Sequence, residues 1–170
     1  MCYKLNIDGS CCPALCTYGI GGVIRNHQSN WIIGFAGCVN QGNPIQIELL
    51  ALLKGLQIAV KQRLLPLTIE TDAQNIIGML KSPAMSCINI VDDCRSLLQQ
   101  LDSASVQVIY REQNDVADKL AKYGATHSVV HTKALDSIHN TLQDIAAHMA
   151  SQRAPSPTPM PIATSPSSSV

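Results

Sequence analysis

Four acidic residues have the types and positions expected of a metal-binding site. Asp8 and Asp72 each come at the end of a short apolar strand pattern, and Glu48 interrupts the most apolar helical stretch of the chain. Asp118 lies beside small residues in a further helical pattern. Carboxylates that converge repel one another unless a cation neutralises them, and oxygen ligands alone favour Mg²⁺ or Mn²⁺. Two such ions are a common arrangement for attack on a phosphodiester, so the set is typical of that chemistry.

Each of the four residues also has an ordinary structural explanation. Asp8 could be a turn residue beside a glycine, and Asp72 could cap the N-terminus of the helix that follows it. Glu48 could reach water at the edge of its helix, although the small residues on that face favour an orientation toward the sheet. Asp118 could be a solvated helical charge. The distances among the four carboxylates are the observation that separates the two interpretations.

The elements that must position these residues predict a mixed α/β domain. Three strand patterns with short connections predict an antiparallel meander, which later strands extend through helical crossovers. If the first and fourth strands are parallel neighbours, Asp8 and Asp72 share one end of the sheet. The expected strands are residues 3–8, 18–25, 31–39, 67–72 and 105–111, with a loop over 9–17; the expected helices are 45–63, 73–81, 88–101 and 114–123, the last ended by Gly124.

Composition limits the partners that this chain is expected to have. Its 170 residues carry 12 Lys and Arg against 12 Asp and Glu, so a nucleic acid must be held by a local patch. Aromatic residues make up 4% of the chain, which argues against a surface that stacks unpaired bases. No apolar stretch approaches membrane-spanning length, so we expect no membrane partner. We also expect a monomer.

The seven cysteines are expected to be free thiols. Their number is odd and no signal-peptide pattern precedes them, which predicts a reducing intracellular compartment, the cytoplasm or nucleus. Cys11, Cys12 and Cys16 are close in sequence but lack a CxxC pair or a nearby histidine. A zinc or redox protein built on these thiols is therefore a less favoured alternative.

The chain is expected to divide into three parts. Residues 1–127 predict the folded domain described above, and residues 128–150 carry a weak helical stripe that predicts a possible extra helix. Residues 151–170 are rich in Ser, Pro, Ala and Thr with almost no charge, which predicts a disordered tail.

Several stretches, taken in order, resemble the ribonuclease H type 1 family, in particular the stand-alone version common in plants and plant retroelements. The matching stretches are residues 4–10, 19–26, 31–35, 48–52, 69–72 and 111–122. Any one of them is a weak signal, but their order and spacing over residues 3 to 126 are highly specific. The resemblance implies a ribonuclease H-like fold with a five-stranded mixed sheet, order 3-2-1-4-5, flanked by helices.

The resemblance also implies an activity, the hydrolysis of the RNA strand of an RNA–DNA hybrid by two metal ions. Asp8, Glu48 and Asp72 would hold the Mg²⁺ or Mn²⁺ ion that activates a water. Asp8 and Asp118 would hold the second ion, which stabilises the leaving 3′ oxygen. The products would carry 5′-phosphate and 3′-hydroxyl ends, and the 2′-hydroxyls in the wide minor groove would mark the RNA strand.

The nucleic acid itself is expected to contact polar residues around this quartet. Those expected contacts are Asn6, Ser10, Asn114 and Arg111. The chain departs from the family in lacking the histidine that many members carry in the loop before the last helix. It also lacks a basic, aromatic-rich helical protrusion, for which Lys81, Arg95, Arg111, Lys119 and Lys122 are the available replacements.

These departures leave a second function open. The alternative is a non-catalytic nucleic-acid-binding or interaction module, derived from a retroelement ribonuclease H domain. The complete acidic quartet favours the nuclease, whereas the neutral charge and the missing histidine favour the module.

Overall fold

The computed structural model of the chain describes residues 2–102 and 104–127. Five strands form one mixed sheet in the order β3-β2-β1-β4-β5, as expected. β1 pairs antiparallel with β2 and parallel with β4, β2 pairs antiparallel with β3, and β4 pairs parallel with β5. The strands are β1 (Tyr3–Cys12), β2 (Thr17–Arg25), β3 (Trp31–Val39), β4 (Leu67–Thr71) and β5 (Ser105–Val108).

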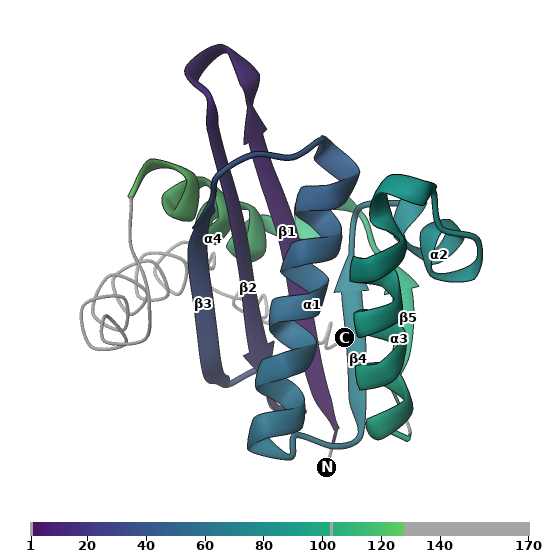
Figure 1. Ribbon diagram of the computed structural model, residues 1–170. Coiled ribbons are helices and arrows are strands. Elements are labelled where there is room, and N and C mark those ends of the chain that lie inside the picture. The colour runs from purple at the N-terminus through teal and green to yellow at the C-terminus, as the bar shows by residue number, and fades with distance from the viewer. Residues whose placement is uncertain (1, 103, 128–170) are drawn as a thin grey trace, which may run out of the picture.

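Helices cover both faces of this sheet. Figure 1 shows α1 and α3 side by side on one face, with α4 crossing the other face behind β1, β2 and β3. The helices are α1 (Pro44–Gln62), α2 (Asn75–Lys81), α3 (Ile88–Gln100) and α4 (Asp115–Thr126), with short 3₁₀ turns η1 (Pro13–Leu15), η2 (Met85–Cys87) and η3 (Arg111–Gln113). Among the described residues, no helix is long and apolar enough to cross a membrane. The expected helix over 128–150 and the expected tail over 151–170 lie outside the described residues.

The main core lies between α1 and the sheet. Leu5 and Ile7 of β1 are fully buried on this face, together with Leu52 and Leu56 of α1. α1 can lie this close because its Gly55 faces Leu5, and a Cβ there would come within 2.6 Å of the leucine side chain. The strand alternation therefore sends the even-numbered residues of β1 to the opposite face, toward α4.

The start of α1 is fixed by three neighbouring residues. Pro44 takes the first helical position, where its missing N–H costs no hydrogen bond. The Asn43 side chain accepts a bond from the Gln46 backbone (2.9 Å), and the Gln46 side chain accepts one from the Asn43 backbone (3.0 Å). This capping box satisfies two exposed donors and sets where the helix begins.

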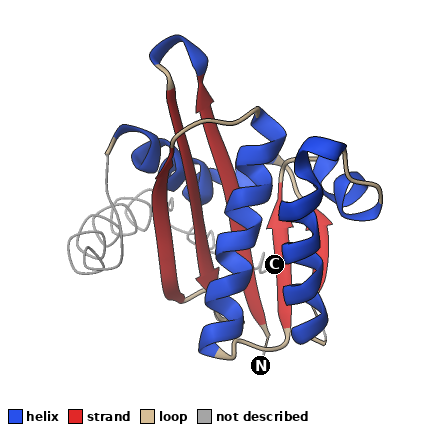
Figure 2. Ribbon diagram, in the orientation of Figure 1, coloured by secondary structure: helices blue, strands red, loops and turns tan. Residues whose placement is uncertain are grey.

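The first strand is longer than predicted. The predicted end at Asp8 and the predicted loop over residues 9–17 are wrong, because β1 continues to Cys12. Residues 9–12 find antiparallel partners on β2, from Gly9 opposite Ile20 to the last pair at Cys12. β3 runs along the same part of β2, from Tyr18 opposite Val39 to Ile20 opposite Gly37, so this extension belongs to the sheet; Figure 2 shows the short turn that joins β1 to β2 at its end.

Three other predicted boundaries also move. α2 begins at Asn75, and Gln74 rather than Asp72 precedes its first turn, so the capping role considered for Asp72 is wrong. β5 ends at Val108, since a 3₁₀ turn follows it. Gly124 does not end the last helix, which runs to Thr126; it lies inside α4 where a Cβ would meet the backbone of β3.

A glycine of β2 decides how close α4 comes to β1. Gly21 pairs with Asp8, and a Cβ on it would lie 2.2 Å from the backbone nitrogen of Ala121 and 2.6 Å from the carbonyl carbon of Leu120. Both atoms belong to the α4 backbone, which has no flexible end that could move aside. The missing side chain therefore lets the helix that carries Asp118 lie directly on β2, beside the strand that carries Asp8.

We expect Gly21→Ala to destabilise the domain by about 1–3 kcal/mol, because the new methyl group overlaps the α4 backbone. The matched control is Gly78→Ala in α2, where nothing lies within 4 Å of the added carbon. That substitution should raise stability by about 0.5–1 kcal/mol through helix propensity. Urea unfolding of both variants measures the difference, and a Gly21→Ala protein as stable as wild type would contradict the close contact.

Candidate active site

Asp8 lies on the face of β1 that α4 covers. It is 7% exposed and sits two residues past Asn6, the last residue of β1 that pairs with β4. The parallel strand has ended at this point, so the side chain of Asp8 is next to the open end of β4 and to α4. Its position beyond the parallel pairing, and not the end of its own strand, places it at the site.

Glu48 reaches the same place from the other face of the sheet. A Cβ on Gly9 would lie 3.0 Å from the Glu48 backbone nitrogen and 3.2 Å from its carboxyl carbon, so the glycine leaves room for this approach. The carboxylate therefore points toward the sheet, as predicted from the small residues on its helix. Its Oε2 is buried and has no hydrogen-bond partner among the described residues. An unpaired buried carboxylate oxygen needs a proton or a cation.

Asp72 follows β4, and its carboxylate accepts a hydrogen bond from the side-chain amide of Asn114, 42 residues later in the sequence. Asn114 Nδ2 donates to Asp72 Oδ1 (2.7 Å) and to the carbonyl oxygen of Ile7 (2.8 Å). Asn114 immediately precedes α4, so one side chain ties the end of β4 to β1 at the start of the helix.

Asp118 is not a freely solvated charge, since its side chain is 19% exposed. Its Oδ2 pairs with Lys122 Nζ at 2.6 Å, one turn along α4, and its Oδ1 lies 3.8 Å from Arg111 Nη2. Lys122 and Arg111 are themselves largely exposed, at 60% and 76% of their side chains. Two cations on the solvent side therefore offset the charge of this carboxylate.

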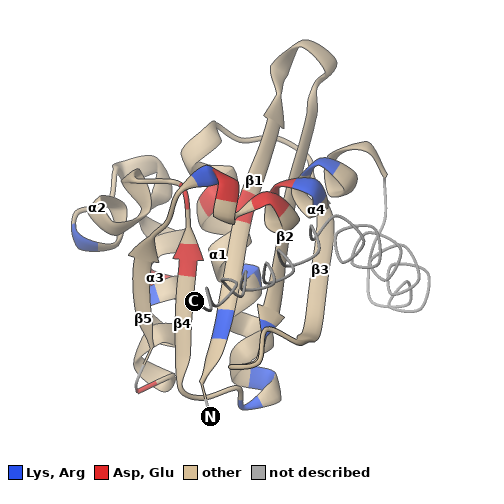
Figure 3. Ribbon diagram, turned by 180° about the vertical axis from the view of Figure 1, so that it is seen from behind, with Lys and Arg blue, Asp and Glu red and all other residues tan. Residues whose placement is uncertain are grey.

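Burial and neighbouring acids raise the pKa values of two of the four carboxyl groups. Burial, and then the charges of Asp72 and Asp118, raise the pKa of Asp8 from 3.8 to about 7. Burial, and then the charges of Asp8 and Asp72, raise the pKa of Glu48 from 4.5 to about 8. Backbone hydrogen bonding by Gly9 opposes both shifts. Figure 3 shows acidic positions of β1 and α4 gathered near the end of β4, with basic positions of α4 beside them.

The donor set fits a hard divalent cation in its chemistry. The four groups are carboxylates, the pKa values of two of them are raised by burial and then by neighbouring acids, and one has an orphaned buried oxygen. In this arrangement, however, no three Asp, Glu, His or Cys side chains of the described residues are drawn together tightly enough to hold one ion. The site is therefore a cluster that an ion would have to tighten, with Asp118 also having to leave Lys122.

The polar residues expected to contact nucleic acid are placed differently from one another. Arg111 is exposed beside Asp118, and Ser10 is half-buried on β1. Asn6 and Asn114 are 1% and 2% exposed, and their side chains are bonded inside the protein. This burial argues against the expected direct contact of Asn6 and Asn114 with a nucleic acid.

The sequence reasoning missed Glu70 as part of the site's surroundings. Glu70 is 6% exposed and lies two residues before Asp72, as Asn6 lies two residues before Asp8. It accepts bonds from Lys4 (2.6 Å), Gln107 (3.1 Å) and Asn6 (3.2 Å). The spacing of two in each strand puts these polar residues on the same face as the acids, a signal that was available in the sequence.

All seven cysteines are free, as expected. Cys87 and Cys94 are buried between the helices and the core, whereas Cys16 and Cys38 are exposed. Among the described residues, these thiols join no group of three or more His, Cys, Asp or Glu side chains placed to hold a metal ion, so the zinc alternative gains no support.

This domain is similar in sequence to a known protein family and to a curated relative. A family model described as reverse transcriptase-like matches residues 6–124. An Arabidopsis thaliana protein with the name "Putative ribonuclease H protein" is 30% identical over 129 residues, which are 74% of this chain and 21% of that relative. The chain thus spans about a fifth of the curated relative that it matches.

Solved structures share the fold at lower identity. RNase H1 from the halophilic archaeon Halobacterium salinarum NRC-1 aligns with a TM-score of 0.67 at 18% identity, over 73% of this chain and 97% of that one. LC11-RNase H1 in complex with an RNA/DNA hybrid aligns with a TM-score of 0.64 at 16% identity, over 72% and 96%. The domain therefore has a ribonuclease H-type fold. The chain belongs to the reverse transcriptase-like family, as a domain of the ribonuclease H type.

Without divalent ions, we expect the stability of the domain to fall as the pH rises from about 4 to about 8. Asp8 and Glu48 have raised pKa values in the folded state, so across this range the folded protein holds protons that the unfolded chain has released. Glu48→Gln should flatten this dependence and raise the free energy of unfolding near pH 8 by on the order of 1 kcal/mol, since it removes one of the repelling charges.

Urea unfolding in EDTA measures this at several pH values. Asp115→Asn is the matched control, because Asp115 is on α4 but half-exposed and paired with Lys119. It should change stability by a few tenths of a kcal/mol at most. A Glu48→Gln protein that is less stable than wild type near pH 8 would show that Glu48 is not under repulsion.

Proposed function

We propose that this domain is an endoribonuclease that hydrolyses the RNA strand of RNA–DNA hybrids with Mg²⁺ or Mn²⁺. The convergence of Asp8, Glu48, Asp72 and Asp118 from two strands and two helices is the observation that carries the proposal. Membership of the family supports it, as does a relative named as a ribonuclease H protein. The solved complex of LC11-RNase H1 with an RNA/DNA hybrid supports the substrate class.

In this proposal the carboxylates divide between two ions. Asp8, Glu48 and Asp72 would hold one ion, and Asp8 and Asp118 would hold the other. The ions, when bound, lower the pKa of a water and stabilise the oxygen that leaves. The chain itself supplies ligand orientation, because Asn114 fixes Oδ1 of Asp72 at 2.7 Å. It also supplies countercharge, because Lys122 and Arg111 neutralise Asp118 until an ion replaces them.

Arg111 is the residue best placed to meet the nucleic acid backbone. Its side chain is 76% exposed, yet its guanidinium lies 3.8 Å from Asp118 and lowers the pKa of Asp8 through its charge. A planar guanidinium at the solvent side of such a site suits a bidentate contact with a phosphate. We therefore assign Arg111 the contact with the phosphate nearest the bond that is cut.

The alternative, a non-catalytic nucleic-acid-binding or interaction module, has its own supporting observation. Asp118 is already paired with Lys122 at 2.6 Å, and within the described part of the chain no three ligands are tightly gathered. A domain of this kind would bind a hybrid through Arg111 and its neighbours without cutting it. We also propose a reducing intracellular compartment, in keeping with the seven free cysteines.

Asp72→Asn is expected to abolish hybrid cleavage in Mg²⁺ while leaving the fold intact. The substitution removes one ligand charge but changes neither shape nor the space around the side chain. Cleavage of a labelled RNA–DNA hybrid is the measurement, with circular dichroism as the check on folding. Asp93→Asn, on the exposed side of α3, is the matched control and should cut as wild type does. A wild type that cuts no faster than Asp72→Asn would leave the non-catalytic module as the better proposal.

Arg111→Gln should weaken hybrid binding to a similar degree for all sequences. Loss of one phosphate contact should also lower the slope of log affinity against log salt by about 1, because one fewer counterion is released. Fluorescence anisotropy with a labelled hybrid over a salt series measures both. Lys61→Gln makes the same charge change at the exposed end of α1 and should leave the slope unchanged. Equal slopes for wild type and Arg111→Gln would remove Arg111 from the interface.

A further inference from the structure

We propose that Asn6 is a positioning residue, which acts through Asn114 to orient the metal-binding carboxylate of Asp72. The inference rests on the proposed function, since it gives Asp72 the role of a ligand. It adds a residue that touches neither substrate nor metal and that lies 1% exposed beneath the site.

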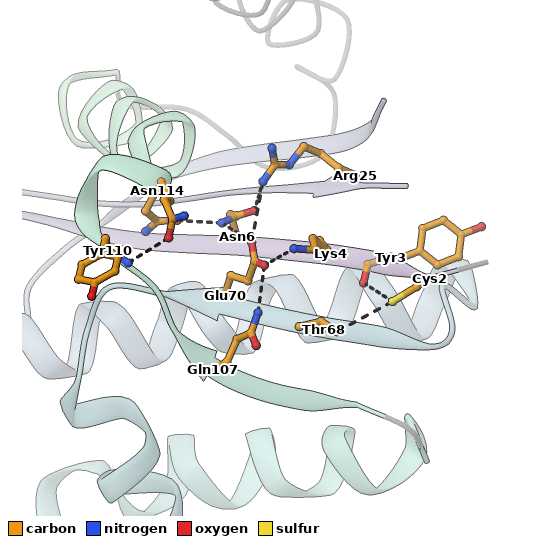
Figure 4. Close-up of polar contacts among 11 residues, drawn as sticks. Cys2, Tyr3, Lys4, Asn6, Arg25, Thr68, Glu70, Gln107, Tyr110 and Asn114 are labelled. Carbon is orange, nitrogen blue, oxygen red and sulfur yellow. Dashed lines mark hydrogen bonds and ion pairs between the residues drawn. The ribbon is translucent and has the colours of Figure 1, made fainter. Parts of the chain in front are cut away.

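A directed chain of hydrogen bonds leads from a guanidinium to this carboxylate. Arg25 Nη2 donates to Asn6 Oδ1 (2.6 Å), Asn6 Nδ2 donates to Asn114 Oδ1 (3.3 Å), and Asn114 Nδ2 donates to Asp72 Oδ1 (2.7 Å). Figure 4 shows Arg25, Asn6 and Asn114 in a row across the face of β1, with Glu70 beside Asn6. In each hydrogen bond the residue nearer Arg25 is the donor, so the series runs in one direction, from Arg25 to Asp72.

The orientation of both amides is fixed by groups that cannot change their role. The Ile7 carbonyl oxygen accepts from Asn114 Nδ2, and a carbonyl can only accept, so the Asn114 amide must present Oδ1 to Asn6. Arg25 can only donate, so the Asn6 amide must present Oδ1 to it and Nδ2 to Asn114. Among the described residues, Asn6 is the donor to the Asn114 oxygen, so it reinforces the amide orientation that the Ile7 carbonyl sets and that donates to Asp72.

Asn114 is where three of the four acid-bearing elements meet. Its side chain bonds the Ile7 carbonyl, one residue before Asp8, and it bonds Asp72 after β4. Its backbone carbonyl accepts the hydrogen bond of the Asp118 backbone N–H (3.1 Å), in the first turn of α4. A turned amide on Asn114 would place its oxygen against two acceptors and push these elements apart.

Glu70 anchors the far end of the network. Its carboxylate accepts the second bond from Asn6 Nδ2 (3.2 Å) and is neutralised by Lys4 (2.6 Å) and Arg25 (3.9 Å). Gln107 donates to the same carboxylate from the exposed side at 3.1 Å, but has no link toward Asn114. Two amides thus donate to the Glu70 carboxylate: Asn6, which also donates to Asn114, and Gln107, which does not.

Groups that hold a metal ligand typically change metal affinity or activity by about tenfold to a hundredfold when they are lost. Asn114 holds Asp72 directly and Asn6 holds Asn114, so a change at Asn6 should carry over to the ion. Because Asn6 is buried, the same change should not alter contact with the hybrid.

Asn6→Asp is the sharpest test, because it keeps the shape and the bond from Arg25 but replaces the donor with an acceptor. We expect repulsion between the new carboxylate and Asn114 Oδ1 to displace the Asn114 amide, the affinity for Mg²⁺ to fall about tenfold or more, and kcat to fall with KM for the hybrid unchanged. The Asn114 side-chain signals in ¹⁵N–¹H NMR spectra report the amide, and calorimetry with Mg²⁺ reports the affinity. Asn6→Ser, which adds no charge, should act in the same direction if Asn6→Asp does not fold.

Gln107→Ala is the matched control, since it removes a hydrogen bond from the same anchor. It should leave the Asn114 signals, the Mg²⁺ affinity and kcat as in wild type. The proposal is overturned if a folded Asn6 variant keeps the wild-type Asn114 signals and Mg²⁺ affinity, or if Gln107→Ala lowers that affinity equally.

Failure of the proposed function gives a different result. A wild type that binds Mg²⁺ but does not cut the hybrid disproves the nuclease, and the Mg²⁺ affinities of the variants still decide the role of Asn6. If wild type binds no Mg²⁺, the metal-dependent function fails as well. In that case the Asn114 side-chain NMR signals are the remaining test of the role of Asn6. Signals that are unchanged in Asn6→Asp overturn the proposal.

Discussion

Mutual repulsion among closely placed carboxylates is the constraint around which this domain is built. Asp8 and Glu48 are pushed toward their protonated forms by burial and by neighbouring acids, and Asp118 needs two cations beside it. Packing must therefore force together groups that electrostatics would separate. Two glycines allow this, Gly9 where α1 approaches β1 and Gly21 where α4 lies on β2.

The polar network on the α4 side of the sheet also helps to hold the repelling carboxylates in place, by hydrogen bonding to Asp72. A wholly apolar face next to the acids would leave their orientation to chance and their charges without nearby dipoles. Instead, Asn6 and Asn114 form a buried, fully directed set of hydrogen bonds that ends on Asp72. Each of the two amides has a partner whose role cannot change, namely the Arg25 guanidinium for Asn6 and the Ile7 carbonyl for Asn114, so one arrangement of the pair is specified.

Much of this arrangement can be predicted from the sequence, because it rests on local patterns. The parallel pairing expected for the first and fourth strands brings Asp8 and Asp72 to one end of the sheet, and the small residues of α1 correctly predict that Glu48 faces the sheet. The length of β1 could not be predicted, because residues 9–12 read as a loop until β2 supplies their hydrogen-bond partners. Gly124 looks like a helix end, but it is required where α4 presses on β3. Burial of Asn6 and Asn114 depends on strand register and on a contact across 108 residues, which no local pattern contains.

The orphaned oxygen of Glu48 has a consequence for how such a domain changes over evolutionary time. Acids that strain the fold are retained only while something selects for them, since random substitution tends to replace them with neutral residues that the fold tolerates better. A lineage that no longer needed its acids would shed them early and keep its shape. The orphaned Glu48 oxygen therefore marks a position where stability of the fold alone would favour a neutral residue.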